Sequence, residues 1–181
     1  MSAAGVALKD IIDKAKAIKI LLIDIDGVMT DGRIVYGIYG DELKFFDVQD
    51  GFGITLLNRA GIKSVIITAN KSRIVKIRAK DLRIAKAYQG YIDKVVPFNN
   101  VLKRFKVSPE EICFVGDDLI DIPVLRRVGL AIAVPNAVEE VKSKAHYITS
   151  KGGGRGAVRE VCDIILKAQG KWQEAAGRYF E

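Results

Sequence analysis

The amino-acid sequence predicts an α/β fold, a Rossmann-like wound parallel sheet with helices on both faces. Residues 19–25 form a continuous apolar run, as expected for a parallel strand that is buried on both faces. From residue 51 onward, short apolar runs alternate with helical patterns, which is typical of repeated βαβ units. The chain has 181 residues, 49% of them hydrophobic, which is enough for one buried core. We therefore expect a single domain that spans residues 1–181.

Each expected element follows from its local pattern. Residues 6–17 are amphipathic and predict a helix before the strand at 19–25. Two β-rich pieces within residues 33–48 flank turn residues at 39–41, which predicts an inserted β-hairpin. The later helices are expected at 52–60, 72–82, 94–105, 119–128 and 137–143, the later strands at 63–68, 85–88, 111–116, 130–134 and 146–149, and a C-terminal helix and polar tail at about 156–181.

Composition excludes several classes of protein. The longest apolar stretch, residues 18–25, contains two charged residues and is far shorter than the roughly 18 residues of a membrane span. Residues 1–19 have no uninterrupted apolar core, which predicts neither a signal peptide nor an anchor. Cys113 and Cys162 lie in apolar surroundings and predict buried free thiols in a reducing compartment. We expect a cytoplasmic protein that does not contact a membrane.

The positive charge is uneven along the chain. The formal net charge is +7, yet residues 63–106 hold twelve Lys and Arg residues against two Asp residues. Nucleic acid and a small anionic substrate are the two partners that such a region could serve. No helix-turn-helix, zinc finger or aromatic RNA-binding signature accompanies the charges, and most lie at the helical spacing of a solvated face. The sequence favours the small anionic substrate and no nucleic acid.

Acidic residues cluster after two of the expected strands. Asp24 and Asp26 follow the first strand, and Asp117, Asp118 and Asp121 follow a later one. Side chains two residues apart on a strand point the same way, so Asp24 and Asp26 can enter one cleft if the strand continues to its end. Paired carboxylates are tolerated when they bind a divalent cation, or when one is a nucleophile and the other a general acid and base. Because the carboxyl ends of parallel strands share one edge of the sheet, we predict a hard-cation site there.

Between the acidic clusters stand two residues that suit a phosphate group. Thr68 ends the strand at 63–68, and Lys94 precedes a later helix. Taken alone, Thr68 is as readily the N-cap of the next helix, and Lys94 a solvated charge. Their places at the ends of successive βα units favour phosphate binding.

The ordered set DIDGVMTDG, VIIT, Lys94 and VGDDLID resembles the motifs of the haloacid dehalogenase superfamily, whose members form an aspartyl phosphate during phosphoryl transfer. The resemblance extends from about Ile18 to Lys171. No sizeable insertion separates the motifs, which is similar to the capless branch and implies that there is no cap domain. In that branch the hairpin assembles a homotetramer with shared active sites. The segments DVQDGFGI, AYQG and GGRGAVREVCDIILKAQGK look like those of sugar-acid phosphatases in lipopolysaccharide precursor biosynthesis.

The resemblance implies a magnesium-dependent phosphatase that acts on the 8-phosphate of an eight-carbon sugar acid. It implies Asp24 as nucleophile and Asp26 as general acid and base. It further implies Mg²⁺ held by Asp24, the Asp26 backbone carbonyl and Asp117, with Asp118 and Asp121 at or behind the metal, Thr68, Ala69 and Lys94 on the phosphoryl oxygens, Arg78 on the sugar-acid carboxylate, and Thr30, Asp50 and Gly51 at the substrate.

One departure from the family pattern bears on the substrate. The family usually continues the threonine as Thr-Gly-Arg, whereas this chain has Thr68, Ala69 and Asn70. Asparagine has no fixed charge, and a lost charged hydrogen bond costs about 1.5 to 3 kcal/mol of binding. Related capless enzymes act on nine-carbon sugar acid 9-phosphates, so the resemblance implies a phosphatase of that type as the alternative. A response-regulator-like receiver is disfavoured because its phosphoacceptor would follow a strand in mid-chain, and a nucleic-acid end phosphatase of the same superfamily is the remaining alternative.

Overall fold

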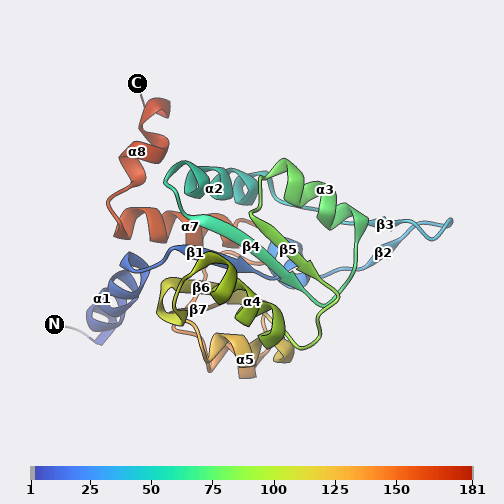
Figure 1. Cartoon of the computed structure of the whole chain (residues 1–181), viewed down its shortest axis with the longest axis horizontal. Coiled ribbons are helices and arrows are strands. Elements are labelled where there is room, and N and C mark those ends of the chain that lie inside the picture. The colour runs from blue at the N-terminus through green and yellow to red at the C-terminus, as the bar shows by residue number, and fades with distance from the viewer. Residues whose placement is uncertain (1–2, 181) are drawn as a thin grey trace.

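The computed structural model describes the backbone of residues 3–180 and the side chains of residues 9–180. Within this range the chain forms a six-stranded sheet in the order β5-β4-β1-β6-β7-β8, with every neighbouring pair parallel (Figure 1). The strands are β1 (Ile20–Ile23), β4 (Lys63–Thr68), β5 (Lys86–Gln89), β6 (Ile112–Gly116), β7 (Leu130–Ala133) and β8 (Tyr147–Ile148). The chain winds outward from β1 in both directions, so β1 and β6 flank the switch point where such sheets bind ligands. The predicted wound parallel sheet is confirmed.

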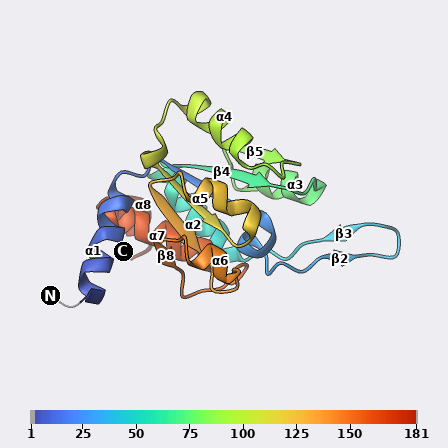
Figure 2. The same cartoon turned by 90° about the horizontal axis from the view of Figure 1, so that it is seen from below.

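Helices cover both faces of the sheet. They are α1 (Ala3–Lys16), α2 (Val48–Arg59), α3 (Arg73–Asp81), α4 (Val95–Phe105), α5 (Ile122–Leu125), α6 (Glu139–Lys142), α7 (Ala157–Ala168) and α8 (Trp172–Ala176). Helices α1, α2 and α7 pack together on one face, and α4 and α5 pack on the other (Figures 1 and 2). No helix within residues 3–180 has the length and apolar character that a membrane crossing requires.

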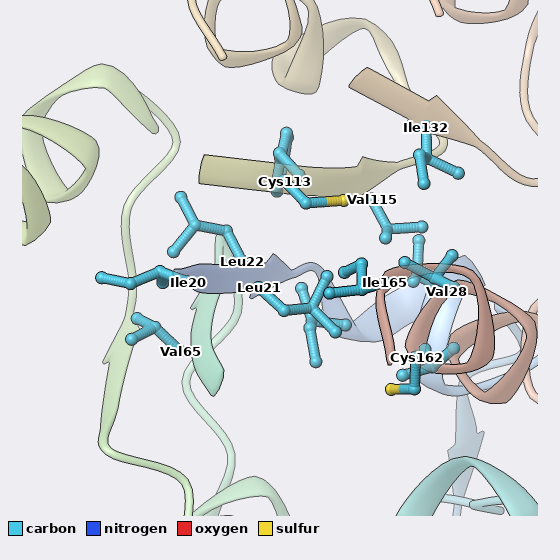
Figure 3. Close-up of a cluster of buried hydrophobic side chains, with 14 of the residues drawn as sticks. Ile20, Leu21, Leu22, Val28, Val65, Cys113, Val115, Ile132, Cys162 and Ile165 are labelled. Atoms are coloured by element: carbon cyan, nitrogen blue, oxygen red, sulfur yellow. The ribbon is translucent and has the colours of Figure 1, made fainter. Parts of the chain in front are cut away.

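The core is built around the central strands. All four residues of β1 are buried, and they pack between side chains of β4, β6 and α7 (Figure 3). Burying one such aliphatic side chain contributes about 1.5 to 3 kcal/mol. Cys113 of β6 and Cys162 of α7 are free thiols within this core, as predicted. Burial raises the pKa of both thiols.

The first strand is shorter than predicted. It ends at Ile23, and residues 25–29 form a tight turn instead of continuing the strand. Gly27 makes this turn possible because its φ of +94° lies in the left-handed region. The Thr30 backbone N–H closes the turn by donating to the Ile25 carbonyl at 3.0 Å. Asp24 and Asp26 therefore do not share one face of a strand.

Two other elements differ from the prediction. The helix expected at 119–128 is a 3₁₀ turn at Leu119–Asp121 followed by the short helix α5. The predicted polar tail, for which no helix was expected, contains α8 and a 3₁₀ turn at Gly177–Tyr179. The Tyr179 ring packs against Phe52 of α2 with ring centroids 5.4 Å apart.

The predicted hairpin is present and projects from the body of the molecule (Figures 1 and 2). Strands β2 (Val35–Tyr36) and β3 (Glu42–Leu43) pair antiparallel. Ile38 and Tyr39 at its tip are each 92% exposed. The other large exposed apolar side chains of this region are Ile34, Tyr36, Leu43, Phe45 and Val48. The hairpin therefore presents an apolar surface that nothing within the described residues covers.

Candidate active site

A cluster of three carboxylates and one lysine, of which only Asp117 is partly exposed, lies at the carboxyl ends of the central strands. Asp24 follows β1, Asp117 follows β6, and Asp121 ends the 3₁₀ turn beyond it. Each offers an oxygen atom within 4.8 Å of the others. Lys94 Nζ lies 2.9 Å from Asp24 Oδ1 and 2.6 Å from Asp121 Oδ1, and the lysine side chain is 0% exposed. One buried cation thus faces three acids, which leaves the cluster short of positive charge.

Asp121 organises the loop that carries Asp117. Its Oδ2 accepts hydrogen bonds from the backbone N–H groups of Asp117 at 2.9 Å and Asp118 at 3.3 Å. The Asp118 side chain is exposed and caps the following turn by accepting from Leu119 N at 2.7 Å. Of the second acidic motif, Asp117 and Asp121 therefore enter the cluster and Asp118 lies at its margin.

The shortage of positive charge is visible in the pKa values of the cluster. Burial raises the pKa of Asp24 to about 7, against the opposing effect of Lys94. Burial and the charges of Asp24 and Asp121 raise the pKa of Asp117 to about 8. Burial opposes the charge on Lys94, but the Asp24 and Asp121 carboxylates outweigh it and raise the lysine pKa. The lysine stays charged, while the raised pKa values bring the titration of Asp24 and Asp117 towards neutral pH.

The metal-free protein should lose stability as the pH rises from about 4 to about 8. The pKa values of Asp24 and Asp117 in the folded state exceed the value of about 3.9 expected in the unfolded chain. The native state therefore binds more protons across this window, so the free energy of unfolding falls as the pH rises. Mg²⁺ that replaces these protons should remove the slope. Thermal melts at several pH values, in EDTA and in Mg²⁺, measure it, and a melting temperature that rises with pH in EDTA would contradict the prediction.

The donor set of this cluster fits a magnesium ion. Carboxylate oxygens are the hard ligands that Mg²⁺ prefers. Asp117 Oδ1 is buried and has no hydrogen-bond partner among the described residues. Asp117 also depends on the glycine at position 27, because a Cβ there would lie 1.9 Å from Asp117 Oδ2. The loops that carry Gly27 and Asp117 pack closely, and Asp117 Oδ1 is left unpaired where a cation would be held.

Asp26 lies outside the buried cluster, in the turn after Asp24, and both of its carboxylate oxygens have partners. Oδ1 forms an ion pair with Lys44, which follows β3. Oδ2 accepts a hydrogen bond from Asn70 Nδ2 at 2.8 Å. Lys44 also pairs with Glu42 at 2.8 Å. Lys44 is not among the site residues predicted from the sequence, and Asn70 is among the predictions only as a departure from the family pattern.

Of the three residues predicted to bind phosphate, one belongs to the carboxylate cluster and two lie at the carboxyl end of β4. Thr68 is buried at the end of β4, and its hydroxyl accepts from Asn70 N at 3.4 Å. Ala69 follows it and is half-buried, and Lys94 belongs to the cluster itself. The Thr30 hydroxyl is turned inward, since it donates to the Ile25 carbonyl at 3.3 Å. In this structure Thr30 holds the turn that carries Asp26, and its role towards substrate stays a prediction.

The three remaining predicted residues form a separate group beside the start of α2. Arg78 lies over the Phe46 ring and donates from Nη2 to the Asp47 carbonyl at 3.3 Å. Gly51 leaves room for it, since a Cβ there would lie 2.5 Å from Arg78 Nη2. Asp50 is buried and accepts from Arg159 N, in the first turn of α7, at 2.8 Å. Burial raises the pKa of Asp50 to about 6. Within the described residues no hydrogen bond joins this group to the carboxylate cluster.

A glycine-rich loop at residues 151–156 packs against the turn that carries Asp26. Asn136 bridges the two segments, because its Nδ2 donates to the Gly27 carbonyl and its Oδ1 accepts from Gly153 N, each at 2.8 Å. A Cβ on Gly153 would lie 1.8 Å from the Gly27 carbonyl oxygen. The sequence offered no signal for Asn136, since an asparagine after a proline is an ordinary turn residue.

A cavity of about 680 Å³ lies between this loop and the base of the hairpin. It is lined in part by Asp31, Arg33, Phe45, Phe46, Gly154 and Arg155. Its two aromatic rings provide apolar surface next to the turn at 25–29, and its two arginines are balanced by Asp31 and Asp47, so the lining carries no net charge.

The chain is similar to a known family of hydrolases and to several known phosphatases. The family model for haloacid dehalogenase-like hydrolases matches residues 66–160. The 3-deoxy-D-manno-octulosonate 8-phosphate phosphatase of Escherichia coli (strain K12) is 45% identical, over 98% of this chain and 99% of its own. A Moraxella catarrhalis enzyme of that name, solved in complex with a magnesium ion, a phosphate ion and a KDO molecule, is 42% identical with a TM-score of 0.92, over 96% of this chain and 99% of its own. The cobalt-bound Haemophilus influenzae enzyme is 34% identical with a TM-score of 0.87, over 92% and 98% of the two chains.

Proposed function

The chain belongs to the haloacid dehalogenase-like hydrolases, and from this membership we infer that it is a magnesium-dependent 3-deoxy-D-manno-octulosonate 8-phosphate phosphatase. It hydrolyses the phosphate monoester to the free sugar acid and inorganic phosphate, a step of lipopolysaccharide precursor biosynthesis. The observation that carries the chemistry is the buried group of Asp24, Asp117 and Asp121 beside Lys94. The substrate is inferred from a relative of that name that is 45% identical over 98% of this chain.

Asp24 and Asp26 divide the chemistry between them. Mg²⁺, which Asp24, the Asp26 backbone carbonyl and Asp117 would hold, supplies positive charge that lets an anionic nucleophile approach a phosphate. Asp24 attacks phosphorus and forms an aspartyl phosphate, while the Asp26 carboxyl donates a proton to the departing sugar oxygen. The Asp26 carboxylate then takes a proton from the water that hydrolyses the aspartyl phosphate, which returns both residues to their starting state.

Thr68, the Ala69 backbone N–H and Lys94 bind the phosphoryl oxygens. The support for this role of Lys94 is its fixed position between Asp24 and Asp121. Asp121 and Asp118 support the metal site from behind and from its margin. Arg78 would take the carboxylate of the sugar acid as a bidentate partner, with Thr30, Asp50 and Gly51 shaping its surroundings.

Phosphate release measured with Mg²⁺ from a panel of sugar acid phosphates tests this function. We expect selective turnover of the eight-carbon 8-phosphate. The nine-carbon 9-phosphate belongs in the panel because Asn70 stands where the family usually has arginine. Turnover of only the nine-carbon ester would keep the mechanism and replace the substrate, and no magnesium-dependent turnover of any ester would reject the proposal.

We further propose a cytoplasmic homotetramer in which each hairpin packs on a neighbouring subunit and helps to complete its active site. The apolar tip of the hairpin supports the assembly, since exposed apolar patches of this kind mark interfaces. The two free buried thiols suit a reducing compartment.

Replacing Ile38 and Tyr39 together by Ser should shift the protein to a smaller oligomer, because it removes the most exposed apolar side chains of the hairpin. Light scattering after size-exclusion chromatography measures the mass. Replacing the exposed Lys103 of α4 by Ser is the matched surface control and should leave the mass unchanged. A double variant that keeps the mass of the unmodified protein would contradict assembly through the hairpin.

A further inference from the structure

We propose that Lys44 and Asn70 are positioning residues that hold the Asp26 side chain in the orientation needed to protonate the departing sugar oxygen. The proposal rests on the proposed function. Its basis is a pair of contacts from two separate segments, the base of the hairpin and the loop after β4, that meet on one carboxylate.

Each donor occupies a different oxygen of Asp26. Lys44 contacts Oδ1 and the Asn70 amide contacts Oδ2. Two contacts on opposite oxygens fix the plane of the carboxyl group as well as its position. Because each carboxylate oxygen can accept more than one hydrogen bond, both retain the capacity to exchange a proton with substrate or water. The arrangement therefore orients the group without blocking its chemistry.

Lys44 is held in this contact by its surroundings. Its side chain is only 2% exposed, and its ammonium group lies between the carboxylates of Asp26 and Glu42. Lys44 directly follows β3, so the hairpin that projects from the molecule also delivers this residue to the site.

Asn70 connects Asp26 with the phosphate side of the site. Its side chain donates to Asp26, while its backbone N–H donates to the Thr68 hydroxyl at 3.4 Å. The residue that replaces the usual arginine of the family thus offers a neutral amide aimed at Asp26. Although Asn70 carries no charge, its side chain therefore still donates a hydrogen bond to Asp26 from this position.

Orientation matters at Asp26 because the residue lies in a turn and not on a strand. A general acid must lie within hydrogen-bond reach of the oxygen that it protonates. A displacement of about 1 Å can cost on the order of a hundredfold in rate. Without its two donors, the half-buried Asp26 carboxyl group would be free to rotate away from the leaving group.

Two substrates with different leaving groups separate this role from a structural one. A sugar alkoxide needs a proton to depart, whereas p-nitrophenolate departs readily without one. We expect Asn70→Leu and Lys44→Met to lower kcat/KM for 3-deoxy-D-manno-octulosonate 8-phosphate by about ten- to a hundredfold. For p-nitrophenyl phosphate we expect less than about a threefold change, because kcat/KM covers only the steps up to departure of the leaving group.

Controls keep the outcomes distinct. Lys44→Arg and Asn70→Gln retain a donor and should restore part of the activity on the sugar phosphate. Lys63→Met removes an exposed lysine at the amino end of β4 and should change kcat/KM for neither substrate. Circular dichroism and melting temperatures check folding. Asn70 is exposed, so its variant keeps the test valid if Lys44→Met does not fold.

Three results would overturn the inference. An equal loss on both substrates would indicate a general disturbance of the site. A raised KM with unchanged kcat for the sugar phosphate would indicate that Lys44 or Asn70 binds the sugar instead. Failure of the unmodified protein on both substrates would overturn the proposed function together with the inference, and would be recognised before any variant is measured.

Discussion

Replacing Lys94 by Met should lower the free energy of unfolding of the metal-free protein by about 3 to 5 kcal/mol. The lysine is fully buried between Asp24 and Asp121, and methionine fills similar space without charge. The change would leave three neighbouring carboxylates with no cation in contact. An uncompensated buried charge is among the most destabilising single changes in a protein.

Chemical denaturation at pH 7.5 in EDTA measures this cost. The cost should shrink at pH 5, where protonation of Asp24 and Asp117 removes their charge, and Mg²⁺ should restore part of the lost stability. Replacing the exposed Lys103 by Met is the matched control, and it should change stability by less than about 0.5 kcal/mol. A loss below about 1 kcal/mol for Lys94→Met would show that the lysine charge does not hold the cluster together.

Replacing Asp24 by Asn should lower kcat by at least about a thousandfold, since a carboxamide cannot replace the carboxylate as nucleophile. The protein should still fold, because asparagine has nearly the same shape and one buried negative charge is removed. Phosphate release measures the loss. Intact-protein mass spectrometry after an acid quench should detect a phosphorylated chain in the unmodified protein and none in the variant.

The control for this change is Asp81→Asn, which alters an exposed carboxylate at the end of α3. It should retain full activity and the same phosphorylated species. An Asp24→Asn variant with more than a tenth of the normal kcat would contradict the assignment of Asp24 as nucleophile and would direct attention to Asp26 or Asp117.

The parallel sheet could be predicted because its strands are buried on both faces and therefore form continuous apolar runs. The strand at 63–68 matches β4 residue for residue. The grouping of Asp24, Lys94 and Asp117 could be predicted for a related reason, since the carboxyl ends of parallel strands meet at one edge whatever the length of chain between them.

The contacts made by single side chains across the chain could not be predicted. Asp26 is 18 residues from Lys44 and 44 residues from Asn70 in sequence, and no local pattern links such positions. The early end of β1 was also missed, because the periodicity of residues 19–25 does not reveal the positive φ that Gly27 adopts two residues later. These features arise from the packing of loops, which the hydrophobic pattern does not encode.

The two buried thiols provide built-in probes of local opening. The chain contains two cysteines, and they lie in different elements, Cys113 in the sheet and Cys162 in α7 (Figure 3). A buried thiol with a raised pKa reacts with an alkylating reagent only when its surroundings open. Alkylation followed by peptide mapping would therefore time the opening of the central sheet and of α7 separately, without any substitution.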